Sequence, residues 1–319
     1  MRASTWSAAG AAAFAGLVLA WGLNYLFVRA GLGLSGPLWL AFLRAGVGAL
    51  GAAIFLVPRV GRRSMSPRDR AWAMLLGVPN TAVFFGLWFV AAGSVLPGEA
   101  AVVVYTFPLW VALFSGPVLG VPLRRPEIVA VVVGFSGIVL VSEPWRAGSA
   151  GLNPLAVLEL LVGSIGWAVG TVAIQRRFSR ETILAAHFYQ LIGGSIALLG
   201  AAVLLEPSAV PRASLALVEI VLWLGLVGTT FAYAVWFTLL ARLRAATLSS
   251  FVFLVPIVAL AASAVVFGER VDPVQGVGVA LVLAAVFLIG RGSTAPPESR
   301  KDGSGPAETP VPSGPGDVR

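Results

Sequence analysis

The chain has 319 residues, of which 58% are hydrophobic and only 11% are charged, and its mean hydropathy is +0.92. Soluble proteins carry about 25% charged residues, and a soluble chain this apolar would expose too much hydrophobic surface. The net charge of +8 comes from basic residues between apolar segments, a pattern typical of membrane orientation signals and not of nucleic-acid binding. The composition therefore predicts a membrane protein.

Side chains that support metal binding or covalent catalysis are scarce. The chain has no cysteine, which excludes disulfides and thiolate chemistry, and its one histidine is His187. No aspartate falls inside an apolar segment, and no glycine-rich nucleotide loop is present. We therefore expect no metal, no cofactor and no enzymatic activity.

Ten apolar segments are long enough to cross a membrane, which takes about 20 residues and at least about 17. They are 8–30, 37–57, 71–92, 98–120, 126–142, 154–174, 182–205, 215–240, 246–267 and 273–290. Their continuous apolar character favours helices over the alternating strands of a barrel. The first segment lacks a clear cleavage region, so we expect it to span and not to be removed as a signal peptide. The sequence thus predicts an all-α membrane protein with ten transmembrane helices.

Arginines in the connections predict the orientation. With the N-terminus inside, twelve arginines fall in cytoplasmic connections and four in outer ones. By the positive-inside rule, both termini should lie in the cytoplasm, with the chain in the inner (plasma) membrane. Residues 291–319 are rich in Pro, Gly, Ser and charge, which predicts a disordered cytoplasmic tail.

The chain repeats itself at a nearly constant offset. The pairs 148 residues apart are Gly77 and Gly225, Thr81 and Thr229, Trp88 and Trp236, Pro108 and Pro256, and Gly120 and Gly268. The pairs 146 residues apart are Trp21 and Trp167, Phe42 and Phe188, and Gly48 and Gly194. Because each unit has an odd number of segments, the second must cross the membrane with opposite polarity. We predict two inverted five-helix repeats, residues 1–145 and 146–290, with a solute site near the midplane between them.

Several short segments also match a known pattern in order and spacing. They are Trp21 to Tyr25, Pro37 to Arg44, Gly98 to Trp110, and Val255 to Glu269. With these segments the chain resembles the EamA-type branch of the drug/metabolite transporter superfamily over about residues 8–290. The resemblance implies export or exchange of amino acids, related metabolites or drugs. The family often closes both repeats with Gly-Glu, but the first repeat here ends in Gly120-Val121. We interpret the missing glutamate as a loop or capping feature.

Polar and aromatic side chains inside the spans are the candidates for the solute site, because polar groups are costly in a bilayer. The predicted substrate-binding residues are Asn24, Tyr25, Arg44, Asn80, Trp88, Tyr105, Glu159, Trp167, Gln190 and Tyr233. Arg44 lies roughly 10 Å into its span. It would either face a cavity and bind a carboxylate, or snorkel to the headgroups.

The other candidates also have structural interpretations. Glu159 would pair with Arg44, titrate with the solute, or lie in a wet outer mouth. Amides such as Asn24 would bind solute or another helix, and the aromatic rings would stack on solute or only pack. His187 is expected near a cytoplasmic helix end, solvated or bonded to a helix. Pro108 and Pro256 interrupt matched helices, which often points to the site.

Together these features predict a secondary transporter, an exporter or exchanger of small organic metabolites working by alternating access. A passive channel or a lipid scramblase is the alternative. The expected partners are a small-molecule solute and membrane lipid, with no nucleic acid. Proton coupling would fall to Glu159 or His187, and the sequence leaves the solute, the direction and the oligomeric state open.

Overall fold

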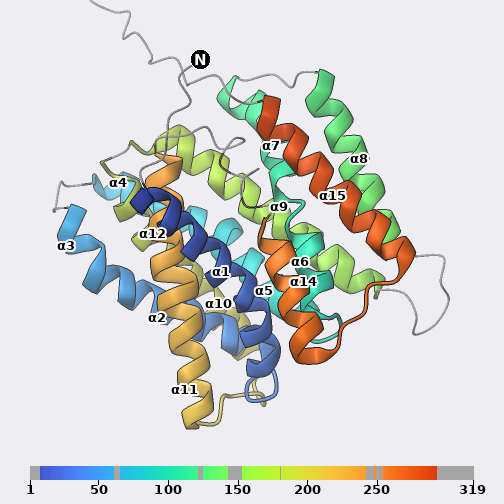
Figure 1. Ribbon diagram of the computed structural model, residues 1–319. Coiled ribbons are helices and arrows are strands. Elements are labelled where there is room, and N and C mark those ends of the chain that lie inside the picture. The colour runs from blue at the N-terminus through green and yellow to red at the C-terminus, as the bar shows by residue number, and fades with distance from the viewer. Residues whose placement is uncertain are drawn as a thin grey trace, which may run out of the picture.

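A computed structural model describes residues 8–60, 65–120, 125–142, 153–179, 181–241, 248, 252 and 254–292 (Figure 1). The described residues form a bundle of helices and contain no β-strand, which confirms the all-α class. The predicted tail beyond residue 292, and most of the predicted start of the ninth span, lie outside the described residues.

Seven helical stretches are long and apolar enough to cross a membrane. They are Gly10–Gly31, Pro37–Phe55, Pro67–Ala91, Pro97–Leu119, Pro154–Arg177, Ile183–Leu205 and Leu215–Leu240. Each coincides with a predicted span. The other three predicted spans fall on shorter apolar helices, Ile128–Val141, Leu254–Phe267 and Pro273–Ala285. The structure thus shows a multi-pass arrangement with seven clear candidates, and the full count of ten stays a prediction.

The helices divide between the two predicted repeats. The first contains α1 (Ala8–Gly31), α2 (Pro37–Phe55), α3 (Val57–Val60), α4 (Pro67–Gly77), the π-helix η1 (Val78–Val83), α5 (Phe84–Ala91), α6 (Pro97–Val104), α7 (Phe107–Leu119) and α8 (Arg125–Ser142). The second contains α9 (Pro154–Arg177), α10 (Ile183–Leu205), α11 (Leu215–Leu222), the π-helix η2 (Trp223–Phe231), α12 (Ala232–Leu240), α14 (Leu254–Phe267) and α15 (Pro273–Gly292). Several begin with proline, whose missing N–H is not needed in a first helical turn.

Contacts between the halves are reciprocal. Helix α2 packs against α10, and α8 lies along α15 (Figure 1). Helix α1 contacts α14 and η2, while α9, its counterpart in the second half, contacts α7 and η1. These contacts of one half therefore have equivalents in the other, and the interface between the halves runs through the middle of the bundle.

Glycines allow the closest of these approaches. A Cβ at Gly193 of α10 would overlap the backbone of Met74 in α4, and one at Gly77 would overlap the Gln190 carbonyl. In the equivalent interface, a Cβ at Gly48 would lie 2.6 Å from the Thr229 methyl carbon. No side chain fits at these positions, because the helix backbones themselves are in contact.

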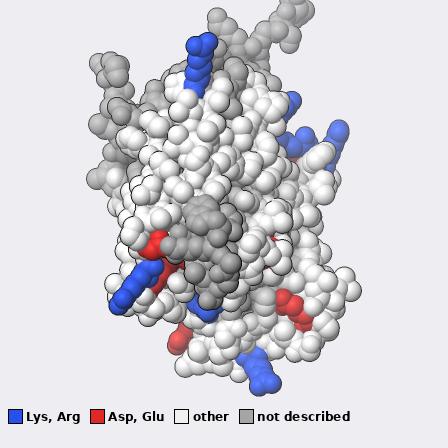
Figure 2. All heavy atoms as spheres, turned by 90° about the vertical axis from the view of Figure 1, so that its right-hand side faces the viewer, with Lys and Arg blue, Asp and Glu red and all other residues white. Residues whose placement is uncertain are grey.

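The outer surface suits a lipid environment. Figure 2 shows that charged side chains gather toward the two ends of the molecule and leave an uncharged band between them. Large apolar side chains such as Leu50, Leu158 and Ile196 are each more than half exposed. Such exposure would be costly in water but is favourable against hydrocarbon.

Two carboxylates join the halves at the end of the bundle where α2 and α6 begin. Glu206, at the end of α10, accepts hydrogen bonds from the Leu38 N–H at 3.1 and 3.0 Å. Glu269, which follows α14, accepts from the N–H groups of Gly98 at 3.0 Å and Glu99 at 3.1 Å. Each carboxylate thus caps a helix N-terminus of the other half, where unpaired N–H groups favour negative charge.

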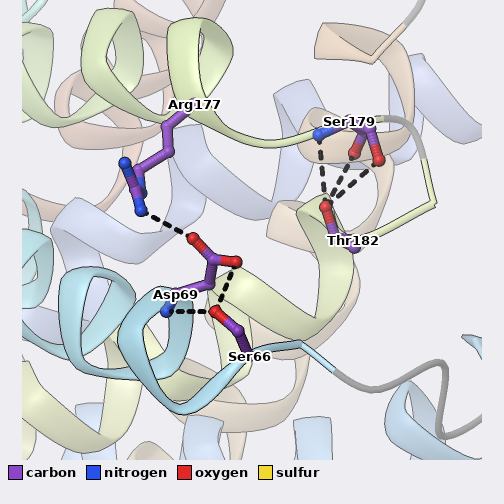
Figure 3. A network of polar contacts seen from close by, with 5 residues as sticks. All are labelled: Ser66, Asp69, Arg177, Ser179 and Thr182. Atoms are coloured by element: carbon purple, nitrogen blue, oxygen red, sulfur yellow. Dashed lines mark hydrogen bonds and ion pairs between the residues drawn. The ribbon is translucent and has the colours of Figure 1, made fainter.

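The opposite end has different chemistry. The repeat offsets place Val60 and Val121 at the positions equivalent to Glu206 and Glu269, and valine cannot accept a hydrogen bond. There the halves are joined by an ion pair of 2.7 Å between Arg177 of α9 and Asp69 of α4, beside the capping Ser66 (Figure 3). Because both side chains of this ion pair are partly exposed, solvent weakens it. The side chain of Glu269 at the other end is buried.

Replacing Glu269 by alanine should loosen the first end. The N–H groups of Gly98 and Glu99 would lose their acceptor, a cost of about 1–3 kcal/mol for buried donors. We expect faster hydrogen–deuterium exchange at these amides and a lower melting temperature in detergent. Glu219→Ala, at an exposed site on α11, is the matched control and should change neither. Unchanged exchange in the Glu269 variant would show that the cap does not hold this end closed.

Candidate functional site

A cavity lies where the two halves meet. Its lining residues are Trp21, Asn24, Tyr25, Arg44, Phe84, Trp88, Tyr105, Trp167 and Tyr233. All of them are buried, and they come from both halves of the chain. Seven of the ten predicted binding residues are among them.

Arg44 occupies the polar side of this cavity. Its side chain is 1% exposed, so it does not snorkel to a membrane surface. Its Nε donates to Thr229 Oγ1 at 3.1 Å and its Nη2 to the Gly228 carbonyl at 3.4 Å. The guanidinium carbon lies 4.0 Å from the centre of the Phe85 ring and 5.0 Å from that of Trp88. Its Nη1 has no hydrogen-bond partner.

The π-helix η2 provides the acceptor for Arg44. A π turn is wider than an α turn and often leaves carbonyl groups available to other partners. The Gly228 carbonyl accepts from Trp21 Nε1 at 3.1 Å as well as from Arg44. Thr229 Oγ1 donates to the Leu224 carbonyl at 2.8 Å, so its hydroxyl both supports the π turn and accepts from Arg44. The unusual turn therefore holds the cation in place.

The second half has the equivalent arrangement without the charge. Gln190, which the repeat aligns with Arg44, donates through Nε2 to Thr81 Oγ1 at 3.3 Å and to Asn80 Oδ1. Asn80 in turn donates to the Trp167 carbonyl at 3.0 Å. These residues lie in η1 and α10, and neither Gln190 nor Asn80 lines the cavity. Both amides support the cavity wall from behind, which was one of the two predicted interpretations.

Asn24 differs from Asn80 in having free hydrogen-bonding groups. It is fully buried on α1, and neither its Nδ2 nor its Oδ1 has a partner. Its side chain lies against Gly228, where an added Cβ would overlap the amide. In the same way, the side chain of Asn80 lies against Gly170, where an added Cβ would overlap it. A buried unsatisfied amide is costly, and this one faces the cavity, so it can bind a solute.

Aromatic rings form the other walls. Trp21 and Trp167, which the repeat aligns, meet edge to face with ring centres 5.5 Å apart. Trp167 also stacks on Phe84 at 4.9 Å, and Tyr25 packs on Trp88 at 4.6 Å. Rings in such contact are held in place and present flat, polarisable surfaces to a solute.

A helix break positions Tyr105. The chain leaves α6 after Val104 and starts α7 at Phe107, because Pro108 has no N–H to donate to the Val104 carbonyl. Ser164 Oγ from α9 donates to that carbonyl instead, at 2.9 Å. The break turns Tyr105 into the cavity wall. Ser164 was not among the predicted residues, since only the fold brings it to the break.

Two residues that were weighed for proton coupling lie away from the cavity. Glu159 is half-buried near the start of α9 and makes no ion pair with Arg44 in the described structure. His187, expected at a helix end, is completely buried, with its ring stacked on Tyr233 at 5.1 Å and against Phe237 at 4.7 Å. The expectation of a solvated histidine was wrong, because rings of α12 cover it.

Comparisons with known proteins identify relatives along most of the chain. The family model described as "EamA-like transporter family" matches twice, at residues 8–143 and 154–291. "Uncharacterized transporter YvbV" of Bacillus subtilis is 26% identical, with 88% of this chain and 90% of that protein covered. "Protein PecM" of Dickeya dadantii is 31% identical over 76% of this chain and 80% of that protein. "Probable amino-acid metabolite efflux pump" of Escherichia coli is 25% identical over 85% and 91%, respectively.

A solved structure gives the same fold. A chain described as "Crystal structure of protein" superposes with a TM-score of 0.64 at 22% identity, covering 89% of this chain and 99% of that one. The double family match agrees with the reciprocal contacts between the halves and with the cavity between them. The chain is a multi-pass membrane protein that belongs to the EamA-like transporter family of the drug/metabolite transporter superfamily.

Proposed function

We propose that this protein is a secondary transporter that exports or exchanges small organic metabolites by alternating access. The observation that carries the proposal is the cavity between the halves, lined from both and containing Arg44 and Asn24 in otherwise aromatic surroundings. A relative named as an amino-acid metabolite efflux pump supports a small organic solute. In this proposal the chain forms ten spans as two inverted repeats, residues 1–145 and 146–290.

The reciprocal contacts between the halves support an alternating-access mechanism. If the two halves exchange conformations, each end of the cavity opens in turn while its central residues keep their partners. The capped ends of α2 and α6 would separate from α10 and α14 to open one side. The opposite side would open between α4 and α9, where the exposed ion pair of Asp69 and Arg177 is the joining contact.

Counterflow should test the transporter proposal. Vesicles loaded with an unlabelled solute should take up the labelled solute transiently above its equilibrium level, because a carrier returns faster when loaded. A channel or a lipid scramblase would show no such overshoot. Amino acids and their carboxylic acid relatives form the first panel, and empty vesicles are the control. Absence of an overshoot for a solute that does permeate would reject the carrier mechanism.

Thiol labelling should test the proposed topology. Because the chain has no native cysteine, single cysteines report without background. A cysteine at Gly61 or Arg176 should be protected from an impermeant reagent in intact cells, and one at Gly148 should react. All three cysteine variants should react after detergent has permeabilised the membrane. The reverse pattern would place the termini on the outer side.

A further inference from the structure

Five hydrogen-bonding atoms of the lining residues have no partner in the protein. Two are the indole nitrogens of Trp88 and Trp167, and the other three, on the two polar side chains, are Arg44 Nη1, Asn24 Nδ2 and Asn24 Oδ1. Both polar side chains contact Gly228, since Arg44 donates to its carbonyl and the Asn24 amide lies against its Cα, so these three atoms belong to one corner of the cavity. An unsatisfied buried donor costs free energy, and more so when it is charged.

Among the described residues that line the cavity, no acidic side chain balances the charge of Arg44. The nine lining residues include no aspartate or glutamate. Among the described residues, the carboxylates that form hydrogen bonds or ion pairs, such as Asp69, Glu206 and Glu269, lie at the ends of the bundle. In the equivalent corner of the second half the position of Arg44 is taken by neutral Gln190, so the positive charge has no acidic counterpart there either.

We infer that the cavity takes a small carboxylate-bearing organic anion, with its carboxylate on Arg44 Nη1 and the Asn24 amide and its apolar body against the aromatic rings of the lining. This inference rests on the proposed transport function and narrows its substrate class. The guanidinium is always charged, and its Nε and Nη2 are already bonded to η2, so its orientation is set before the solute arrives. A carboxylate would satisfy Nη1 and Nδ2 together by charge-assisted hydrogen bonds.

The same arrangement disfavours an amine. An ammonium would meet the positive charge of Arg44 in a low-dielectric cavity without a carboxylate to offset it. Two of the rings that could stabilise a cation, Phe85 and Trp88, already lie under the guanidinium. A zwitterionic amino acid would therefore bind less well than the corresponding acid without its amino group.

Three flat molecules of nearly the same shape can test the charge preference directly. Benzoate, benzamide and benzamidine carry a negative, zero and positive charge on one ring. Binding to the purified full chain in detergent is measured by titration calorimetry at neutral pH. We expect benzoate to bind at least about tenfold more tightly than benzamide, with benzamidine weakest. A further pair, 3-phenylpropanoate and phenylalanine, isolates the effect of an ammonium group, and the former should bind more tightly.

The variant Arg44→Gln copies the residue of the other half and supplies the control. It should weaken benzoate binding at least about tenfold and benzamide binding much less, and Arg44→Lys should recover part of the loss for benzoate. Equal binding of all three ligands, tighter binding of benzamidine, or no binding of any would overturn the inference. The wild-type order alone decides if Arg44→Gln does not fold. The transporter proposal is tested independently by counterflow. If benzoate is not preferred but another solute class shows counterflow, only the anion inference fails. If a permeating solute shows no counterflow, the transporter proposal fails.

Discussion

Transport of an organic anion should be nearly lost when Arg44 is replaced by alanine. The substitution removes the cavity's charge, leaves Thr229 Oγ1 without its donor and leaves the Gly228 carbonyl with Trp21 as its remaining side-chain donor. A charge-assisted hydrogen bond contributes about 1.5–3 kcal/mol, which corresponds to roughly a 10- to 150-fold fall in uptake at low solute concentration. Arg44→Lys should lose less, because it keeps the charge but cannot bond Thr229, Gly228 and a solute together.

The measurement is initial uptake of labelled solute into vesicles at matched protein content. Arg68→Ala serves as the matched control, since Arg68 is exposed at the start of α4 and lies outside the cavity. It should transport like the parent. Uptake by the Arg44→Ala variant within about twofold of the parent would remove Arg44 from the binding site, because the loss of one charge-assisted hydrogen bond already predicts roughly a tenfold fall or more.

Replacing Gly193 by alanine should severely destabilise the bundle. The added Cβ would lie 2.6 Å from the Met74 carbonyl carbon and 2.7 Å from its Cα. Both are backbone atoms of a packed helix, so no rotamer change can relieve the overlap, and α4 must move away from α10. Overpacking of this kind costs about 1–3 kcal/mol and occasionally more. Moving the helices apart would also lengthen the hydrogen bond between Gln190 Nε2 and Thr81 Oγ1.

Gly200→Ala is the matched control on the same helix. A Cβ at Gly200 would meet nothing within 4 Å, and alanine favours a helix over glycine by about 0.5–1 kcal/mol. Thermal unfolding in detergent, followed by size-exclusion or fluorescence, should show a clearly lower melting temperature for Gly193→Ala and an unchanged or higher one for Gly200→Ala. Similar melting temperatures would mean that α4 and α10 are not packed backbone to backbone.

The helices and much of the cavity could be predicted from composition and repetition. Apolar runs with proline at their starts identify helices without knowledge of the tertiary fold, and the repeat alignment joins Trp21 with Trp167. Arg44 and Asn24 stood out because few other polar side chains fall within apolar spans. Seven predicted residues therefore meet in one cavity.

The remaining features depend on distances that no local pattern encodes. Nothing in the sequence of η2 indicates a π turn, because it contains no proline, yet that turn supplies the acceptors of Arg44. Gln190 aligned correctly with Arg44, but its bond to Asn80 depends on how α10 meets η1. Glu159 precedes the cavity residue Trp167 by about 12 Å along α9, which is too far for the expected contact.

The carboxylate caps at one end of the cavity have a consequence for affinity. A solute can enter from a given side only while that side is open, so its apparent dissociation constant is the intrinsic one divided by the open fraction. If the ends open in turn as proposed, Glu206 and Glu269 should lower the open fraction at their own end, because the opposite end carries valines at the equivalent positions. One and the same cavity should therefore show weaker apparent affinity, and a higher half-saturating concentration, on the side of α2 and α6. The equilibrium distribution of the solute across the membrane is unaffected. The direction with the higher half-saturating concentration also has the higher maximal rate, so the two changes cancel.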